Sequence, residues 1–146
     1  MPNSRACYRK LRRYKYQLMQ DYTISIDIET EEDIEMSFIV LTSDGKLTIK
    51  NRYAWDGPSG PTIDTKSFMR GSLVHDALYQ LMRERKLDYL EHREYADNLL
   101  KKICLEDGMS KFVPGMFTKQ FASLARKMHG HPQSPKTKSF TFLNHL

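Results

Sequence analysis

Two ionisable side chains interrupt apolar stripes of helical spacing, and these two are the residues best suited to chemistry. His75 lies in line with Phe68 and Met82. Asp97 lies three residues before Leu100, on the stripe that follows. Because burying a carboxylate costs several kcal/mol unless it is hydrogen-bonded or paired, Asp97 is expected to face a partner. His75, on the preceding antiparallel helix, is the expected one.

A His-Asp pair of this kind is a candidate general base. The carboxylate holds one imidazole nitrogen and so fixes the tautomer, which leaves the other nitrogen to take a proton from water. Asp76 lies about 100° further round the same helix and points to a different neighbour. The loop through Asp56 and Gly57 is the candidate, since glycines let carbonyls turn toward a hard cation. The alternative is that His75 is a satisfied core residue in a structural network.

The first half of the chain must supply a sheet. Residues 14–53 alternate apolar and polar positions, which predicts an antiparallel sheet of three or four strands. Asp44 and Gly45 stand between two apolar runs and predict a two-residue type I′ turn, which needs a positive φ twice. Residues 55–61 are rich in glycine and proline and predict a shaped loop.

The second half has the period of helices. The first helix should carry one stripe of buried residues: Phe68, Ser72, His75, Tyr79 and Met82. The second, from about Asp88 to Leu105, should face inward with Ala96, Leu99, Leu100, Ile103 and Cys104 and end at Gly108. A third helix is opened by Ser110 and Pro114 and ends at Gly130. The predicted fold class is therefore α+β, with a single domain over residues 1–130 and a tail over residues 131–146.

Composition places the chain among ordinary globular domains. It has 146 residues, of which 40% are hydrophobic and 28% charged. No apolar run approaches the roughly 20 residues that span a bilayer, and no apolar run follows the basic N-terminus. We expect neither a signal peptide nor an anchor, and no integral membrane protein. Cys7 and Cys104 have no framework or metal-ligand spacing, so we interpret both as free thiols in a reducing compartment.

The net charge of +5 is unevenly distributed. The first fifteen residues are strongly basic, whereas an acidic patch follows soon after: Asp27, Glu29, Glu31, Glu32, Asp33 and Glu35. The basic arm suits nucleic acid in a non-specific way, an anionic membrane surface or an acidic protein partner. A simple solvated end is the plainer interpretation.

A run from Tyr53 to Asp97 carries a first resemblance. Asp56 and Ser59, then residues 75–79 (His-Asp-Ala-Leu-Tyr), then residues 93–97 (Arg-Glu-Tyr-Ala-Asp) resemble an uncharacterised family of tailed bacteriophages, domain of unknown function 1353. The sequence departs from that family at Pro58-Ser59-Gly60-Pro61. The resemblance implies a phage origin and hence synthesis in the host cytoplasm, and it implies no activity. The basic arm and the Lys-rich tail suit docking to other chains, so a place in the virion with other virion proteins as partners is a hypothesis.

The same residues also resemble the bacterial members of the phospholipase A2 superfamily. Asp56 precedes Asp76 by 20 residues and Asp97 follows His75 by 22, which is similar to the spacing in those enzymes. The resemblance implies that His75 is the base, Asp97 its orienting carboxylate, Tyr79 a hydrogen-bond partner of Asp97, and Asp76 a calcium ligand, with Trp55, Asp56 and Gly57 completing the calcium shell. The disulfides of that superfamily have no counterpart here, and its members lack a β-rich first half.

Three functions follow as hypotheses. The first is a phage-encoded, virion-associated hydrolase that cleaves an ester bond of the host envelope with a phospholipid substrate. The alternative is a non-enzymatic tail or neck component in which the same residues form a structural network. A third, weaker hypothesis is a metal-dependent phosphohydrolase that would need further ligands from His92, His129 and His131.

Overall fold

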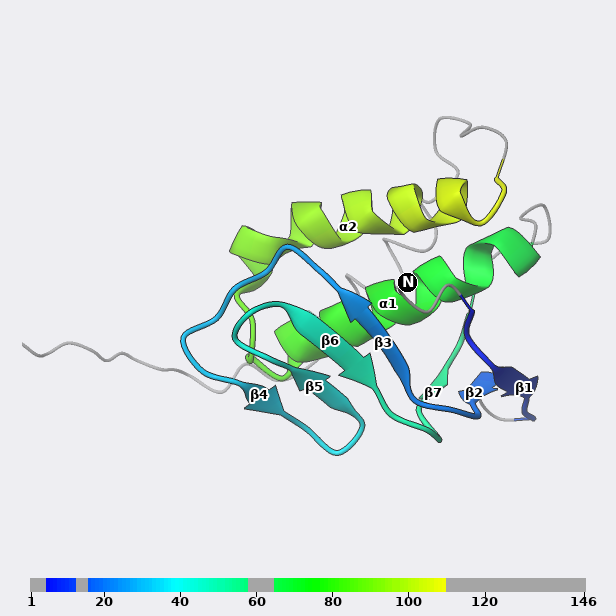
Figure 1. Ribbon diagram of the computed structural model, residues 1–146, viewed down its shortest axis with the longest axis horizontal. Coiled ribbons are helices and arrows are strands. Elements are labelled where there is room, and N and C mark those ends of the chain that lie inside the picture. The colour runs from blue at the N-terminus through cyan, green and yellow to red at the C-terminus, as the bar shows by residue number, and fades with distance from the viewer. Residues whose placement is uncertain (1–4, 13–15, 58–64, 110–146) are drawn as a thin grey trace, which may run out of the picture.

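The chain folds into strands followed by a helix pair, as the computed structural model in Figure 1 shows. The structure describes residues 5–12, 16–57 and 65–109. Along these residues the elements are β1 (Tyr8–Lys10), β2 (Tyr16–Leu18), β3 (Tyr22–Ser25), β4 (Ile34–Glu35), β5 (Ile39–Leu41), β6 (Lys46–Ile49), β7 (Ala54–Trp55), α1 (Thr65–Arg83) and α2 (Tyr89–Glu106). The predicted α+β class is confirmed at this level.

The strands form two antiparallel sheets, where a single sheet of three or four strands was predicted. One sheet has the order β1-β2-β7 and the other the order β3-β6-β5-β4. The β2–β7 pairing extends beyond the strands, since Leu18 donates to the Tyr53 carbonyl (2.8 Å) and accepts from the Arg52 amide (2.8 Å). Alternation tells which face of a strand is buried, but it does not tell which strands pair. The prediction of one sheet was wrong for that reason.

The β5–β6 hairpin is present, but its turn is not the predicted type I′. Residues 42–45 connect the strands, and the Gly45 amide donates to the Thr42 carbonyl at 3.0 Å. Gly45 has a φ of +95°, whereas Asp44 does not have a positive φ. Hairpin connections of more than two residues that contain one glycine with a positive φ are also common. A side chain at Gly45 would also collide with the Ile26 carbonyl oxygen.

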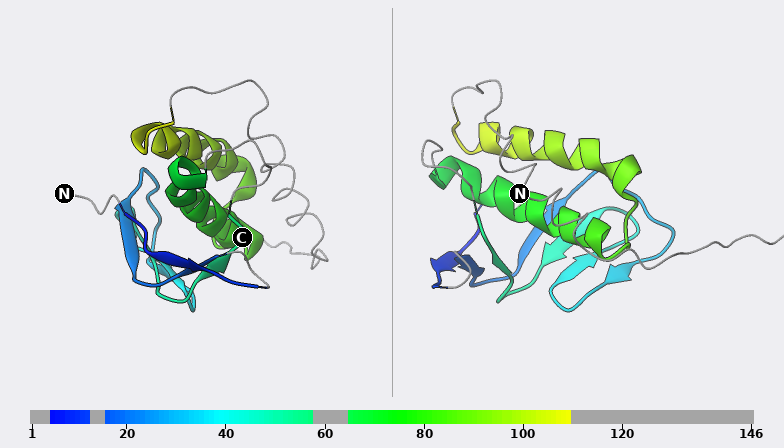
Figure 2. Two further views of the ribbon diagram at one scale, coloured as in Figure 1. Left: turned by 90° about the vertical axis from the view of Figure 1, so that its right-hand side faces the viewer. Right: turned by 180° about the vertical axis from the view of Figure 1, so that it is seen from behind.

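Helix α1 lies between the sheets and α2 (Figure 2). All residues from 67 to 75 are buried, so the helix is enclosed on more than the single stripe predicted. The predicted stripe itself is buried at every position: Phe68, Ser72, His75, Tyr79 and Met82. The two helices approach closely at Gly71, where a Cβ would lie 2.9 Å from Leu100 Cδ1 and 3.0 Å from Cys104 Sγ.

Helix α2 has the ends that its sequence predicts. The Asp88 side chain accepts a hydrogen bond from the Glu91 amide at 2.8 Å and caps the N-terminus. At the other end Gly108, with a φ of +105°, donates to the Leu105 carbonyl, and Met109 donates to the Cys104 carbonyl. This is the pattern of a Schellman motif. The predicted third helix, residues 110–130, and the predicted tail lie outside the described residues.

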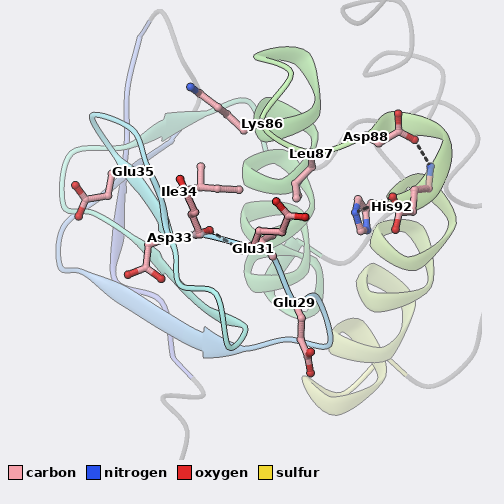
Figure 3. A pocket seen from close by; sticks show the side chains of 12 residues that line it. Glu29, Glu31, Asp33, Ile34, Glu35, Lys86, Leu87, Asp88 and His92 are labelled. Carbon is pink, nitrogen blue, oxygen red and sulfur yellow. Dashed lines mark hydrogen bonds and ion pairs between the residues drawn. The ribbon is translucent and has the colours of Figure 1, made fainter. Parts of the chain in front are cut away.

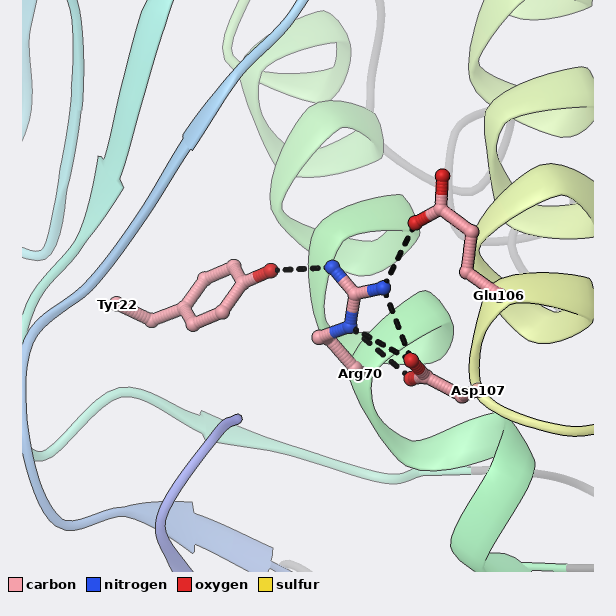
Figure 4. A network of polar contacts seen from close by, with 4 residues as sticks. All are labelled: Tyr22, Arg70, Glu106 and Asp107. Atoms are coloured by element: carbon pink, nitrogen blue, oxygen red, sulfur yellow. Dashed lines mark hydrogen bonds and ion pairs between the residues drawn. The ribbon is translucent and has the colours of Figure 1, made fainter. Parts of the chain in front are cut away.

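A buried arginine joins α1 to the end of α2 and to β3 (Figure 4). Arg70 contacts Asp107 with Nε and Nη2, at 2.9 to 3.2 Å, and Glu106 with Nη2 at 2.9 Å. Its Nη1 donates to the Tyr22 hydroxyl at 2.9 Å. Three elements that are distant in sequence are therefore held by one guanidinium, because its planar fork offers five donors.

The sequence contains a signal for this arginine, although Arg70 was not among the residues predicted to be buried. Arg70 stands in line with Val74, Ala77 and Leu81, all of which are buried. A charged residue on an apolar stripe must find partners, by the same argument that singled out Asp97. The partners, however, lie at the C-terminal end of α2 and in the distant strand β3, and helical spacing cannot locate them.

The two cysteines are free and lie in different environments. Cys7 is exposed and Cys104 is buried. Burial, with a smaller contribution from the charge of Asp107, raises the pKa of Cys104 to about 12. We expect iodoacetamide at about pH 7.5 to alkylate Cys7 in the native protein and Cys104 only after denaturation, as mass spectrometry of the two peptides would show. Labelling of both thiols at one rate in the native protein would contradict this.

Among the residues described, no helix combines the length and apolar character needed to cross a membrane.

Candidate active site

The His75–Asp97 pair predicted from the sequence is present between the two helices. His75 Nε2 lies 2.7 Å from Asp97 Oδ1, and the Tyr79 hydroxyl donates to the same oxygen at 2.8 Å. The His75 side chain has no exposed surface and that of Asp97 is 14% exposed. His75 and Tyr79 are one turn apart on α1, so both reach the carboxylate that α2 presents.

The geometry fixes the roles of the two imidazole nitrogens. An ionised carboxylate only accepts hydrogen bonds, so His75 Nε2 donates to Asp97, and in the neutral imidazole Nδ1 is then the nitrogen that carries the lone pair. Nδ1 is buried. Burial, and then the hydrogen bond to Asp97, raise the pKa of Tyr79, which keeps its hydroxyl protonated as a donor. Asp97 is therefore held by two donors and in turn orients the imidazole.

Asp76 faces a different neighbour, as its position on the helix predicts. The Tyr53 hydroxyl, just before β7, donates to Asp76 Oδ2 at 3.2 Å. The pKa of Tyr53 is raised well above its ordinary value, by burial first, then by Asp76 and to a smaller extent by Asp56. The negative charges of both carboxylates therefore act on one buried hydroxyl, that of the residue before β7.

Trp55 and Gly57, whose loop carbonyls were predicted to complete a calcium shell, also have packing roles in the structure. The Trp55 indole is buried and its Nε1 donates to Ser72 Oγ at 3.1 Å. Gly57 has a φ of +74°, and a Cβ there would lie 2.5 Å from Cε2 of the Tyr16 ring. Close packing thus explains this glycine, and only the main-chain carbonyls of Trp55 and Gly57 remain as cation ligands.

The carboxylate oxygens near the end of the sheet are of the ligand type that calcium binds. Asp76 and Asp56 offer the hard oxygen ligands that Ca²⁺ prefers. Within residues 5–12, 16–57 and 65–109, no three His, Cys, Asp or Glu side chains converge in a way that could hold a metal. A calcium site here would need main-chain carbonyl oxygens for most of its shell. Ser59, part of the phage-family resemblance, lies outside the described residues.

The structure also forms an acidic cleft that the sequence did not predict (Figure 3). It has a volume of about 860 Å³ and lies between residues 29–35 and the start of α2 with the connection before it. Glu31, Asp33 and Asp88 line it together with Lys86 and His92. The cleft does not include His75, so it is separate from the dyad. His92 lies 3.8 Å from Glu91, while His129 and His131, the other ligands of the phosphohydrolase hypothesis, lie outside the described residues.

Comparisons with known proteins add no relative from which a role is transferred. No family model matches the chain, and neither a curated protein nor a solved structure does. Both resemblances therefore stay predictions, and the function is argued from the arrangement of His75, Tyr79, Asp97 and Asp76.

Proposed function

We propose that this protein is a hydrolase that cleaves an ester bond with a His75–Asp97 general-base dyad. The observation that carries the proposal is the shared oxygen Asp97 Oδ1, which accepts from both His75 Nε2 and Tyr79. This arrangement fixes the imidazole as the Nε2–H tautomer and leaves the lone pair on Nδ1. A phospholipid of a host envelope is the substrate that the resemblances suggest, with a phage virion as the place of action.

The proposed reaction uses a water molecule as the nucleophile. His75 Nδ1 takes a proton from the water as it attacks the ester carbonyl, and the imidazolium that forms is stabilised by the Asp97 carboxylate. His75 then returns the proton to the departing alcohol, so that no covalent intermediate is needed. Tyr79 keeps Asp97 in place through the cycle because its hydroxyl stays protonated.

Calcium is the proposed cofactor, and Asp76 with Asp56 would hold it. When bound, it supplies positive charge beside the developing oxyanion. Tyr53 orients the Asp76 carboxylate through the 3.2 Å hydrogen bond.

The Asp76→Asn variant tests the cation site directly. We expect the wild-type protein to bind Ca²⁺ in a calorimetric titration and the variant to bind at least about tenfold more weakly, because a charged ligand becomes neutral. Asp44→Asn, in the exposed β5–β6 connection, is the matched control and should bind like the wild type. Equal calcium affinity in wild type and Asp76→Asn would remove Asp76 from the site.

A second candidate function, a non-enzymatic virion component, is favoured by one observation. The side chain of His75 has no exposed surface and Tyr79 is 1% exposed, as expected of a polar network that locks α1 to α2. In that case His75, Tyr79 and Asp97 stabilise the helix pair and perform no reaction. Hydrolysis of mixed phospholipid vesicles by wild type and His75→Asn separates the two functions, since only the first predicts turnover that the substitution abolishes.

A further inference from the structure

The three-stranded sheet has a surface of positive charge that the proposed reaction does not use. Its exposed cationic residues, here called the basic edge, are Arg5, Arg9, Lys10, Arg12 and Arg52. Across residues 5–12, 16–21 and 51–57 the acidic residues are Asp56 and Asp21, whose carboxylate accepts from the Asn51 amide at 2.8 Å. No ion pair found among the described residues involves any member of the basic edge.

Part of the basic edge is held in a fixed geometry. Arg9 on β1 lies opposite Gln17 on β2, and both Nε and Nη2 of Arg9 donate to Gln17 Oε1, at 3.0 and 2.7 Å. Gln17 Nε2 in turn donates to the Arg52 carbonyl at 3.1 Å, which joins the Arg52 backbone to the same network. The Arg9 guanidinium keeps three further N–H donors for another acceptor. Because β1 pairs with β2 alone among the described strands, Arg9 and Lys10 lie on a free edge strand, whereas Arg52 directly precedes β7 on the other side of β2.

Within the described residues, the basic edge and the acidic cleft lie in different parts of the fold. Strands β1 and β2 lie at one end in Figure 1, and β4, beside the acidic cleft, lies toward the other. A polyanion is therefore attracted to the basic edge and repelled by the acidic cleft, so the approach is oriented.

From these observations we propose that the basic edge binds the phosphate backbone of a nucleic acid without reading its sequence. Four of its five cations are arginines, whose planar fork matches two phosphate oxygens. Stable attachment to a bilayer would need an apolar face or a lipid anchor in addition to the positive charge. Near the basic edge only Tyr8 (38%) and Met19 (45%) are large exposed apolar residues, and the other three found in the described chain, Phe38, Leu90 and Leu105, lie elsewhere.

The salt dependence of binding measures how many phosphates are neutralised. Each phosphate contact on duplex DNA changes the slope of log K against log salt by about −0.9. Five contacts predict a slope of about −4.5, which is a loss of about 500-fold in affinity between 50 and 200 mM salt. The probe is a fluorescein-labelled duplex of 30 base pairs, titrated with the full chain and followed by anisotropy.

Two variants of equal net charge make the test specific. Arg9→Gln/Arg12→Gln removes two members of the basic edge and should bring the slope to about −2.7, a loss of only about 40-fold over the same salt range. Lys101→Gln/Lys102→Gln, on exposed positions of α2, should leave the slope near −4.5. Circular dichroism melting confirms that both variants are folded before they are compared.

Two results would overturn the proposal. One is the absence of duplex binding at 50 mM salt, and if vesicles that contain phosphatidylserine are bound instead, the basic edge recognises a membrane surface. The other is an equal change of slope in the two double variants, which would show an effect of net charge alone. Neither of these results depends on the activity of His75.

Discussion

Replacing His75 by asparagine is expected to lower the rate of ester hydrolysis on phospholipid vesicles by at least about 100-fold. General-base catalysis contributes about 10²- to 10⁴-fold, and the asparagine amide has no lone pair basic enough to replace Nδ1. The rate is measured as release of free fatty acid from mixed vesicles in the presence of calcium. Wild type and variant are compared at equal concentration of folded protein.

The chain offers a matched control for this substitution. His92→Asn removes a histidine from α2 that lines the acidic cleft and has no contact with Asp97, so the hydrolysis rate should not change. Tyr79→Phe keeps the imidazole and removes one of the two donors to Asp97. Its effect should be smaller than that of His75→Asn, because Asp97 still accepts from His75.

The same variants decide between a catalytic and a purely structural dyad. Loss of a hydrogen bond to a buried carboxylate costs about 1.5 to 3 kcal/mol, so all dyad variants should unfold at lower urea concentration whichever role is correct. Only catalysis predicts that turnover falls far more in His75→Asn than the loss of folded protein explains. Unchanged turnover in that variant, or no hydrolysis by the wild type, would leave the structural network as the function of these residues.

Replacing Arg70 by methionine is expected to lower the free energy of unfolding by about 3 kcal/mol. Breaking a buried ion pair typically costs about 3 to 5 kcal/mol, because the remaining charge loses its partner. The lower end applies here, since Asp107 is 17% exposed and Glu106 is 49% exposed, so water replaces part of the lost contact. Urea unfolding of wild type and variant gives the difference directly.

Two further variants identify the source of that loss. Arg83→Met removes a half-buried arginine from the last turn of α1 and should change stability by no more than about 1 kcal/mol. Arg70→Met/Asp107→Asn should be more stable than Arg70→Met alone, because the unpaired carboxylate is removed with its partner. If Arg70→Met were as stable as the wild type, Arg70 would not hold the end of α2.

Local patterns were sufficient for the helix pair and its dyad. His75 and Asp97 interrupt the apolar stripes of two neighbouring antiparallel helices, so each is the nearest polar partner expected for the other. The 2.7 Å contact between His75 Nε2 and Asp97 Oδ1 agrees with this expectation. The caps of α2 were equally predictable, since Asp88 and Gly108 act within one turn of the chain. In each case the decisive interaction is short in sequence or is forced by burial.

Contacts between distant segments decided the rest. Arg70 finds Tyr22 and Asp107, the Gln17 side chain joins Arg9 to the Arg52 backbone, and residues 29–35 form a cleft with the start of α2. Contacts between distant segments also decided the strand order and the division into two sheets. Helical and strand periods report which face of an element is buried, but the partner of that face is chosen by packing over the whole chain. The sequence by itself thus determined the dyad and the elements that carry it, while the tertiary structure decided the contacts of Arg70, the acidic cleft and the basic edge.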